Sequence, residues 1–215
     1  MSGRLTKEHK KQLEDWIGKG SRTFELVFSL TKDEGTAKAF HDKCDNQGPT
    51  VTVVYNDQNS IYGGYAYESW KYSGGYYSDA NAFLFQLAFS GNKKRNKFSV
   101  KTSGNALYGY STKGPIFGQD DLWTFNKAVK DGNVYRIDGD MSGFGSTYDS
   151  LGTKSVDINN DSKVVIDIEV YKVTGKLKQL SFCLLNTNIL ISVCPSCVVL
   201  QVVKTRLYMY FESLG

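Results

Sequence analysis

Alternating apolar and polar residues along much of the chain predict strands with one buried face. Residues 23–30 read "TFELVFSL", with an apolar side chain at every second position. Residues 162–173 read "SKVVIDIEVYKV" and predict the clearest strand of the chain. The expected apolar face of that strand consists of Val164, Ile166, Ile168 and Val170. Glu169 interrupts this run, and the period of two predicts that it faces solvent. The alternative is that Glu169 anchors a loop or contacts a partner.

Other strand-like runs surround two expected turns. Residues 50–56 and 60–67 flank "NDQN", which predicts a β-hairpin. Residues 82–89, "AFLFQLAF", predict a strand buried on both faces. Shorter strands are expected at 97–102, 106–111, 121–125 and 133–138, a loop at 68–81 and a polar turn at 90–96. The pattern therefore predicts about nine strands.

Helical spacing of apolar residues occurs twice. Residues 6–18, "TKEHKKQLEDWIG", place an apolar stripe on one face and end at a glycine. In residues 36–44, "TAKAFHDKC", Phe40 and Cys44 share a face, and Gly48 and Pro49 follow the end of the helix. The sequence therefore predicts two short helices beside the strands.

Composition agrees with one packed antiparallel domain. The 215 residues are 40% hydrophobic, 22% charged and 13% aromatic, with 21 glycines and 3 prolines. The net charge of +4 is too small to favour nucleic acid or an anionic membrane as the main partner. The first sixteen residues contain no apolar core of a secretory signal, so we expect a cytoplasmic protein.

A change in composition at residue 176 divides the chain into an expected domain at 1–176 and an atypical tail at 177–215. The tail holds three of the four cysteines, and residues 180–203 contain no charged side chain. This run has the length of a membrane span, but Asn186, Asn188 and Pro195 within it disfavour that interpretation. The hypotheses for the tail are a segment foreign to the domain, a packed extension and, less favoured, a membrane anchor.

His41 and Cys44 form the most obvious candidate for chemistry. Their spacing of three on a helix permits a Cys–His nucleophile. A zinc site needs about four ligands, and the sequence offers one such pair. Because Cys44 shares its face with Phe40, we interpret it as a buried apolar side chain, and we expect no catalytic residue and no metal site here.

Two acidic runs have the spacing of calcium loops only in part. Asp138–Asp149, "DGDMSGFGSTYD", lacks a flanking helix and ends in Asp rather than Glu. Residues 157–169 have Ser162 where such a loop requires glycine. We interpret both as solvated loops and leave calcium binding by Asp138–Asp149 open.

Four further patterns carry weak chemical signals. The glycine loops lack the phosphate-binding spacing G-x-x-x-x-G-K-[ST], so no nucleotide cofactor is expected. The tyrosines of residues 62–77 are expected to cover a sheet face rather than to stack on bases, because Lys71 is the one cation among them. "KKRNK" at 93–97 is expected in a solvated hairpin turn. "CPSC" at 194–197 has redox spacing without the βαβ setting that this chemistry needs.

Several sequence segments of the main domain resemble one family in their order and in their residues. They are residues 24–66, Trp70, "DANAFLFQL", "GPIFGQDDLWTF" and "DIEVYKV". Together they resemble the TLDc domain, and "CDNQGPTVTVVY" and "IEVYKV" are most similar to the branch at the N-terminus of interferon-induced protein 44. The resemblance implies a mainly β, α+β fold, namely a two-sheet antiparallel β-sandwich with short flanking helices.

The resemblance also implies a function. TLDc proteins are associated with oxidative-stress protection and with binding of the vacuolar proton ATPase, and the interferon-induced members with antiviral innate immunity. It provides architectural positions rather than catalytic ones. These positions are Phe40, Cys44, Gly48, Pro49, Gly63, Gly64, Phe83, Phe85, Gly114, Pro115, Phe117, Gly118, Glu169 and Tyr171.

We therefore expect a non-enzymatic protein-interaction module with a protein partner and no cofactor. Two alternatives remain: a weak redox or hydrolytic enzyme that uses Cys44 and His41, and a form anchored to a membrane through its tail.

Overall fold

The computed structural model describes residues 3–175. The expectations for residues 177–215, including the membrane run and the "CPSC" motif, lie outside the described residues. Within the described range no helix combines the length and the apolar character needed to cross a membrane. The predicted boundary at residue 176 stays a prediction.

Strands dominate the described part of the chain. The helices are α1 (Lys7–Ile17), α2 (Ala37–Cys44) and α3 (Val156–Asn159), with a 3-10 turn at Ser103–Asn105. The strands are β1 (Arg22–Ser29), β2 (Thr50–Asn56), β3 (Ile61–Ala66), β4 (Gly75–Tyr77), β5 (Phe83–Phe89), β6 (Asn92–Ser99), β7 (Leu107–Gly109), β8 (Ile116–Phe117), β9 (Leu122–Trp123), β10 (Ala128–Asp131), β11 (Val134–Ile137) and β12 (Val164–Gly175).

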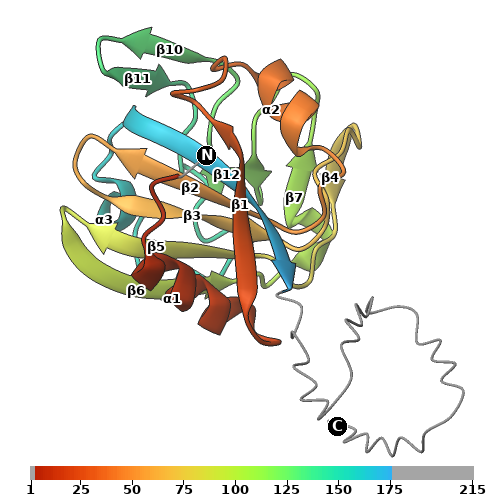
Figure 1. Cartoon of the computed structure of the whole chain (residues 1–215). Coiled ribbons are helices and arrows are strands. Elements are labelled where there is room, and N and C mark those ends of the chain that lie inside the picture. Colours follow the sequence, from red (N-terminus) through yellow and green to blue (C-terminus); the bar gives the residue numbers. More distant parts are fainter. Residues whose placement is uncertain (1–2, 176–215) are drawn as a thin grey trace, which may run out of the picture. The chain divides into compact units, whose positions relative to one another are not determined.

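These strands form two antiparallel sheets, as expected for the β-sandwich with flanking helices (Figure 1). The larger sheet has the order β10-β11-β12-β2-β3-β5-β6, and β1 also pairs with β12. The smaller sheet has the order β4-β7-β8-β9. The long strand β12 is therefore central, because it pairs with β1 and β11 along one edge and with β2 along the other.

Two hydrophobic cores lie on opposite faces of the larger sheet. The inner core fills the space between the sheets and includes Phe40, Cys44 and Phe117. The outer core includes Leu13 of α1, with Phe83 and Phe85 of β5. Figure 1 shows α1 lying across β5 and β6. The expected two-sided burial of β5 is confirmed, because one face of this strand meets each core.

Local chemistry explains where both predicted helices begin and where α1 ends. The Thr6 hydroxyl accepts a hydrogen bond from the His9 amide and caps α1, which ends at Gly18 with φ of 72°. The Thr36 hydroxyl caps α2 in the same way through the Ala39 amide. The predicted hairpin is confirmed by the pairing of β2 with β3.

The predicted single apolar faces of β1 and β12 are wrong, because each strand changes face at a register shift. The pairing of β1 shifts between Leu26 and Phe28, so that Leu26 packs on the outer core and Phe28 on the inner one. In β12 the shift between Val165 and Asp167 places Val165 in the inner core and Ile166 against the outer core. A bulge inserts one residue and reverses the alternation beyond it.

Several short elements were not expected. The predicted loop at 68–81 contains β4, β10 was not predicted, and α3 follows no helical pattern long enough to recognise. The "KKRNK" cluster lies on β6 rather than in a turn, because Ser90 and Gly91, both with positive φ, make the reversal before it. Lysines suit this position, since β6 is an edge strand of the larger sheet.

Gly64 sets the distance between the two sheets. A Cβ atom there would lie 2.6 Å from the ring of Phe117, which is fully buried. A Cβ atom at the neighbouring Gly63 would clash with the Thr52 carbonyl oxygen and come within 2.9 Å of the Phe85 ring. Both glycines therefore allow strand β3 to approach its neighbours.

We predict that Gly64→Ala lowers the free energy of unfolding by about 1–3 kcal/mol, because the added methyl group overpacks the inner core. Gly75→Ala is the matched control, since a Cβ at Gly75 meets no atom within 4 Å. Urea denaturation of the two variants measures the difference. Equal stabilities would contradict the account of the close approach.

Candidate functional site

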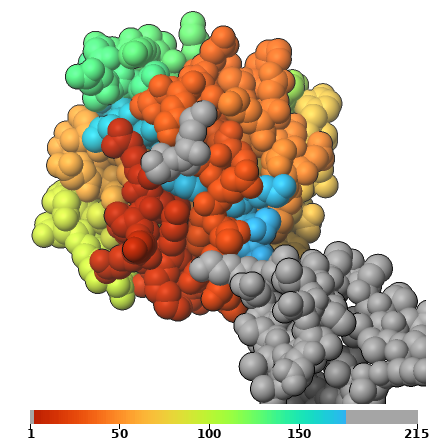
Figure 2. All heavy atoms as spheres, in the orientation of Figure 1, coloured from red at the N-terminus to blue at the C-terminus, as the bar shows by residue number. Residues whose placement is uncertain are grey.

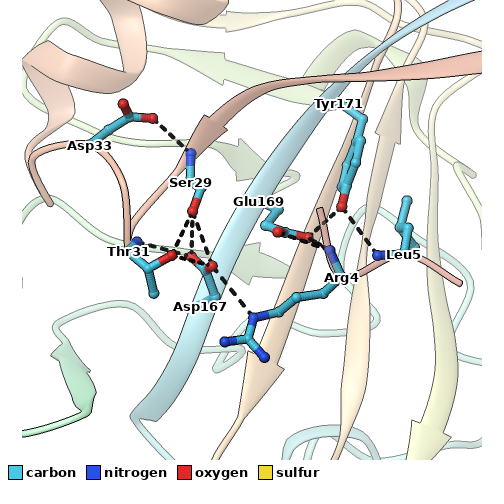
Figure 3. A network of polar contacts seen from close by, with 8 residues as sticks. All are labelled: Arg4, Leu5, Ser29, Thr31, Asp33, Asp167, Glu169 and Tyr171. Carbon is cyan, nitrogen blue, oxygen red and sulfur yellow. Dashed lines mark hydrogen bonds and ion pairs between the residues drawn. The ribbon is translucent and has the colours of Figure 1, made fainter. Parts of the chain in front are cut away.

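Three polar side chains of β12 point to the outer face of the larger sheet, beneath the N-terminal residues (Figure 3). They are Asp167, Glu169 and Tyr171, and we call them the N-terminal clamp. All three are at least 98% buried. In Figure 2 the N-terminal residues and β1 cover most of β12, which is visible only in patches between them.

Glu169 and Tyr171 hold the backbone of residues 4 and 5. The Arg4 amide donates to both carboxylate oxygens of Glu169, at 3.1 and 2.9 Å. The Leu5 amide donates to the Tyr171 hydroxyl at 3.2 Å, and that hydroxyl donates to Glu169 Oε2. A buried carboxylate is costly unless such donors replace its water, so these bonds offset the desolvation of Glu169.

Asp167 joins the N-terminal segment to the end of β1. Its carboxylate accepts hydrogen bonds from the Ser29 hydroxyl at 3.0 Å and from the Thr31 hydroxyl at 2.8 Å. The Thr31 amide adds a third bond at 3.3 Å. The Arg4 guanidinium lies 3.6 Å away and supplies the opposite charge. Asp167, near the C-terminal end of the domain, therefore binds residues from the N-terminal segment and from the end of β1.

The prediction that Glu169 faces solvent is wrong, because its side chain is 1% exposed. The two-residue period of the strand does place Glu169 on the other face from Ile168 and Val170. The residues preceding α1 cover that face. Of the alternatives considered for Glu169, the structure supports the anchor. Arg4 itself was not predicted to contribute, since no local pattern connects it to a strand 165 residues away.

The two tyrosines of this region are held in their neutral form. Burial, and then the hydrogen bond to Glu169, raise the pKa of Tyr171 well above its ordinary value. Burial raises the pKa of Tyr55 in the same direction, with further contributions from the nearby Tyr171 and Glu169. The Tyr171 hydroxyl can therefore donate to the carboxylate throughout the physiological pH range.

His41 and Cys44 lie on the same helix but make different contacts. His41 Nδ1 lies 2.8 Å from Asp45 Oδ1, and Nε2 lies 3.0 Å from the Tyr110 carbonyl oxygen and 2.9 Å from that of Lys113. Both ring nitrogens are thus occupied by groups other than the Cys44 thiol. His41 joins α2 to the loop that follows β7.

Cys44 is fully buried in the inner core. Burial raises the pKa of its thiol far above the ordinary value, and the nearby Asp45 and Asp33 add to the shift. A thiolate is the reactive form of cysteine, so this environment disfavours nucleophilic chemistry. The packing predicted for Cys44 with Phe40 is confirmed.

The carboxylates of the Asp138–Asp149 run are engaged separately. Asp138 accepts from the Asn126 amide at 2.7 Å, Asp140 from Ser142 and Asp149 from the Leu151 amide. Throughout residues 3–175, no three His, Cys, Asp or Glu side chains converge in a geometry suited to a metal ion.

The glycine loop is an inter-strand connection. Gly114 donates to the Phe125 carbonyl oxygen at 2.7 Å, Ile116 and Phe117 form β8, and Gly118 adopts a positive φ of 67° beside Asp121. Asp121 was not singled out from the sequence. It is fully buried and accepts bonds from the amides of residues 145, 147 and 148.

Four tyrosines form a connected surface on the outer side of the smaller sheet, and we call it the tyrosine face. Its members are Tyr72, Tyr76, Tyr108 and Tyr110. Ring centroids are 4.8 Å apart for Tyr76 and Tyr108, and 6.0 Å for both Tyr108–Tyr110 and Tyr72–Tyr110. Tyr76 and Tyr108 oppose each other across β4 and β7, as expected for tyrosines that cover a sheet.

The two sheets, the outer helix and the N-terminal clamp together define a β-sandwich domain with polar contacts buried on its outer face. The TLDc domain family model matches residues 2–174, and the chain belongs to this family. No curated protein sequence matched the chain.

We predict that Glu169→Gln lowers the free energy of unfolding by about 1–3 kcal/mol, because the neutral amide accepts weaker hydrogen bonds and loses one acceptor oxygen. Glu25→Gln, at an exposed position of β1, is the control and should change stability by less than about 0.5 kcal/mol. Chemical denaturation followed by tryptophan fluorescence measures both. Equal changes in the free energy of unfolding would show that Glu169 contributes no more to stability than an exposed carboxylate does.

We predict that native Cys44 resists alkylation by iodoacetamide and reacts once the protein is unfolded, because its sulfur is buried and its pKa is raised. Mass spectrometry of the peptide that contains Cys44 separates it from the other cysteines. Modification of native Cys44 at the rate of a free thiol would contradict its burial.

Proposed function

We propose that this chain is a protein-interaction module of the TLDc type that works without catalysis, and that the tyrosine face is its contact surface. The observation that carries the proposal is the exposure of large aromatic side chains on one sheet face. Tyr72 is 65% exposed, Tyr76 43% and Tyr110 38%. Tyrosine is enriched in protein interfaces and among the residues that dominate their binding energy.

The packing of these rings supports the proposal. Each tyrosine already contacts another, so its side chain loses little conformational freedom when a partner covers it. The hydroxyls remain available at the surface for hydrogen bonds, while the rings provide apolar area. The His41 contact to the Tyr110 carbonyl further fixes the segment after β7.

The resemblance to TLDc proteins supports a proposal about the partner and its setting. We propose a role in the innate immune or oxidative-stress response, with the vacuolar proton ATPase as a candidate partner. The sequence segments "CDNQGPTVTVVY" and "IEVYKV" support placement of the chain in the interferon-induced protein 44 branch. Induction of the transcript by interferon would test that placement.

We predict that the double variant Tyr72→Ala/Tyr110→Ala weakens partner binding by roughly tenfold or more, because truncating interface tyrosines costs more than 1 kcal/mol each at binding hot spots. Tyr67→Ala is the matched control, since Tyr67 is 44% exposed and lies outside the tyrosine face. Proteins captured from cells by the tagged chain and by both variants are quantified by mass spectrometry. Binding is then measured with the purified partner.

The proposal requires a partner that the control retains and the double variant loses. Capture that is unchanged in the double variant would place the interface elsewhere. Thermal unfolding of both variants checks that the exposed substitutions leave the domain folded.

A further inference from the structure

A cavity of about 380 Å³ lies between α1 and the larger sheet. Its floor includes Ile61, Leu87 and Ile166, and its rim is formed by the N-terminal residues, α1, the turn after β2 and strand β6. This volume falls in the range of small-molecule sites. The cavity is separate from the tyrosine face, because α1 and the smaller sheet lie on opposite faces of the larger sheet.

Positive charge is concentrated in the lining of this cavity. Its cationic members are Arg4, Lys93, Lys94 and Arg95, and its one carboxylate is Glu8. Glu8 and Asp167, which pairs with Arg4 from outside the lining, offset two of these four cations and leave an excess of two positive charges. Glu8 already bonds Lys93 and Arg95, and these two cations lower its pKa. Lys94 makes no ion pair with any residue in the range 3–175.

Protection of a strand edge does not account for this arrangement by itself. Lysines on an edge strand discourage pairing with other chains. Here, however, Lys93 and Arg95 turn toward α1 and contact Glu8. Arg4, in the N-terminal segment that precedes α1, lines the same cavity. The contact between Arg4 and Asp167 fixes the guanidinium near this position. The cations therefore border a hollow in addition to following the edge strand β6.

Uncharged donors are also present. Gln12 and Asn59 line the cavity, and neither side chain makes a hydrogen bond within the described residues. Amide groups of this kind can bond hydroxyl groups of a ligand. Arginine can bind two oxygens of one phosphate group, and lysine adds a point charge.

We propose that this cavity binds a small phosphate ester of a hydroxylated ring. The two excess charges match one phosphate group, which carries nearly two negative charges at pH 7, and the amides match ring hydroxyls. A bounded cavity favours a small ligand over a nucleic-acid strand, because the tyrosine face, on which bases could stack, lies on the opposite side of the sandwich. The same chemistry occurs in a soluble ester and in a lipid headgroup.

The test uses the full chain and inositol trisphosphate as the probe, measured by isothermal titration calorimetry. The variant Lys93→Gln/Lys94→Gln removes two lining charges, and Lys127→Gln/Lys130→Gln removes two exposed charges near and on β10. We expect the first variant to bind at least roughly tenfold more weakly and the second to bind as wild type does. Circular dichroism confirms that both are folded.

Cosedimentation with phosphatidylcholine vesicles, with and without phosphatidylinositol bisphosphate, separates the two sources of the ligand. Binding to the bisphosphate vesicles supports a lipid headgroup, and binding to the soluble probe alone supports a free ester. Absence of trisphosphate binding at about millimolar concentration would overturn the proposal. So would equal weakening in the two variants, or tighter binding of single-stranded RNA with the same dependence on Lys93 and Lys94.

Discussion

The hydrogen bonds from the Arg4 amide to the Glu169 carboxylate are the constraint on which the rest of this domain depends. A charge buried in the centre of the larger sheet must receive donors, and β12 itself supplies one, the Tyr171 hydroxyl. The Arg4 amide supplies the bonds to both carboxylate oxygens. These bonds direct the chain into α1, which covers the outer core. The stability of the outer layer is thus coupled to one carboxylate on the last described strand.

This constraint also divides the surface into two regions of different chemistry. The clamped N-terminal segment brings Arg4 beside the cations of β6 and creates a basic cavity under α1. The smaller sheet, on the other side of the sandwich, presents the tyrosine face. The inner core between these layers is filled by aromatic rings, including Trp70 and Phe117, whose edge-to-face contact has a centroid distance of 5.3 Å. A packed core of this kind holds the two proposed binding surfaces in place.

The sequence predicts the parts of this fold that depend on local pattern. The apolar run of β5, the β2–β3 hairpin and the shared face of Phe40 and Cys44 follow from periods of two and 3.6 residues. The burial of Glu169 does not, because its partners are distant in sequence and charged residues on alternating strands usually face water. The bulges in β1 and β12 are hidden for a different reason. Continuous apolar runs, Leu26 to Phe28 and Val164 to Ile166, lie at the two shifts and mask the reversal of the alternation. The tyrosines were visible in the sequence, but their assembly into one surface required the pairing of β4 with β7.

Hydrogen exchange at the backbone amides of Arg4 and Leu5 tests the central claim most directly. If these amides donate to Glu169 and Tyr171 in solution, they should exchange slowly, with protection comparable to that of the paired amides of β12. Measurement by NMR resolves each amide separately. Exchange at the rate of an unstructured peptide would contradict the account, because the N-terminal segment would then be free of the sheet.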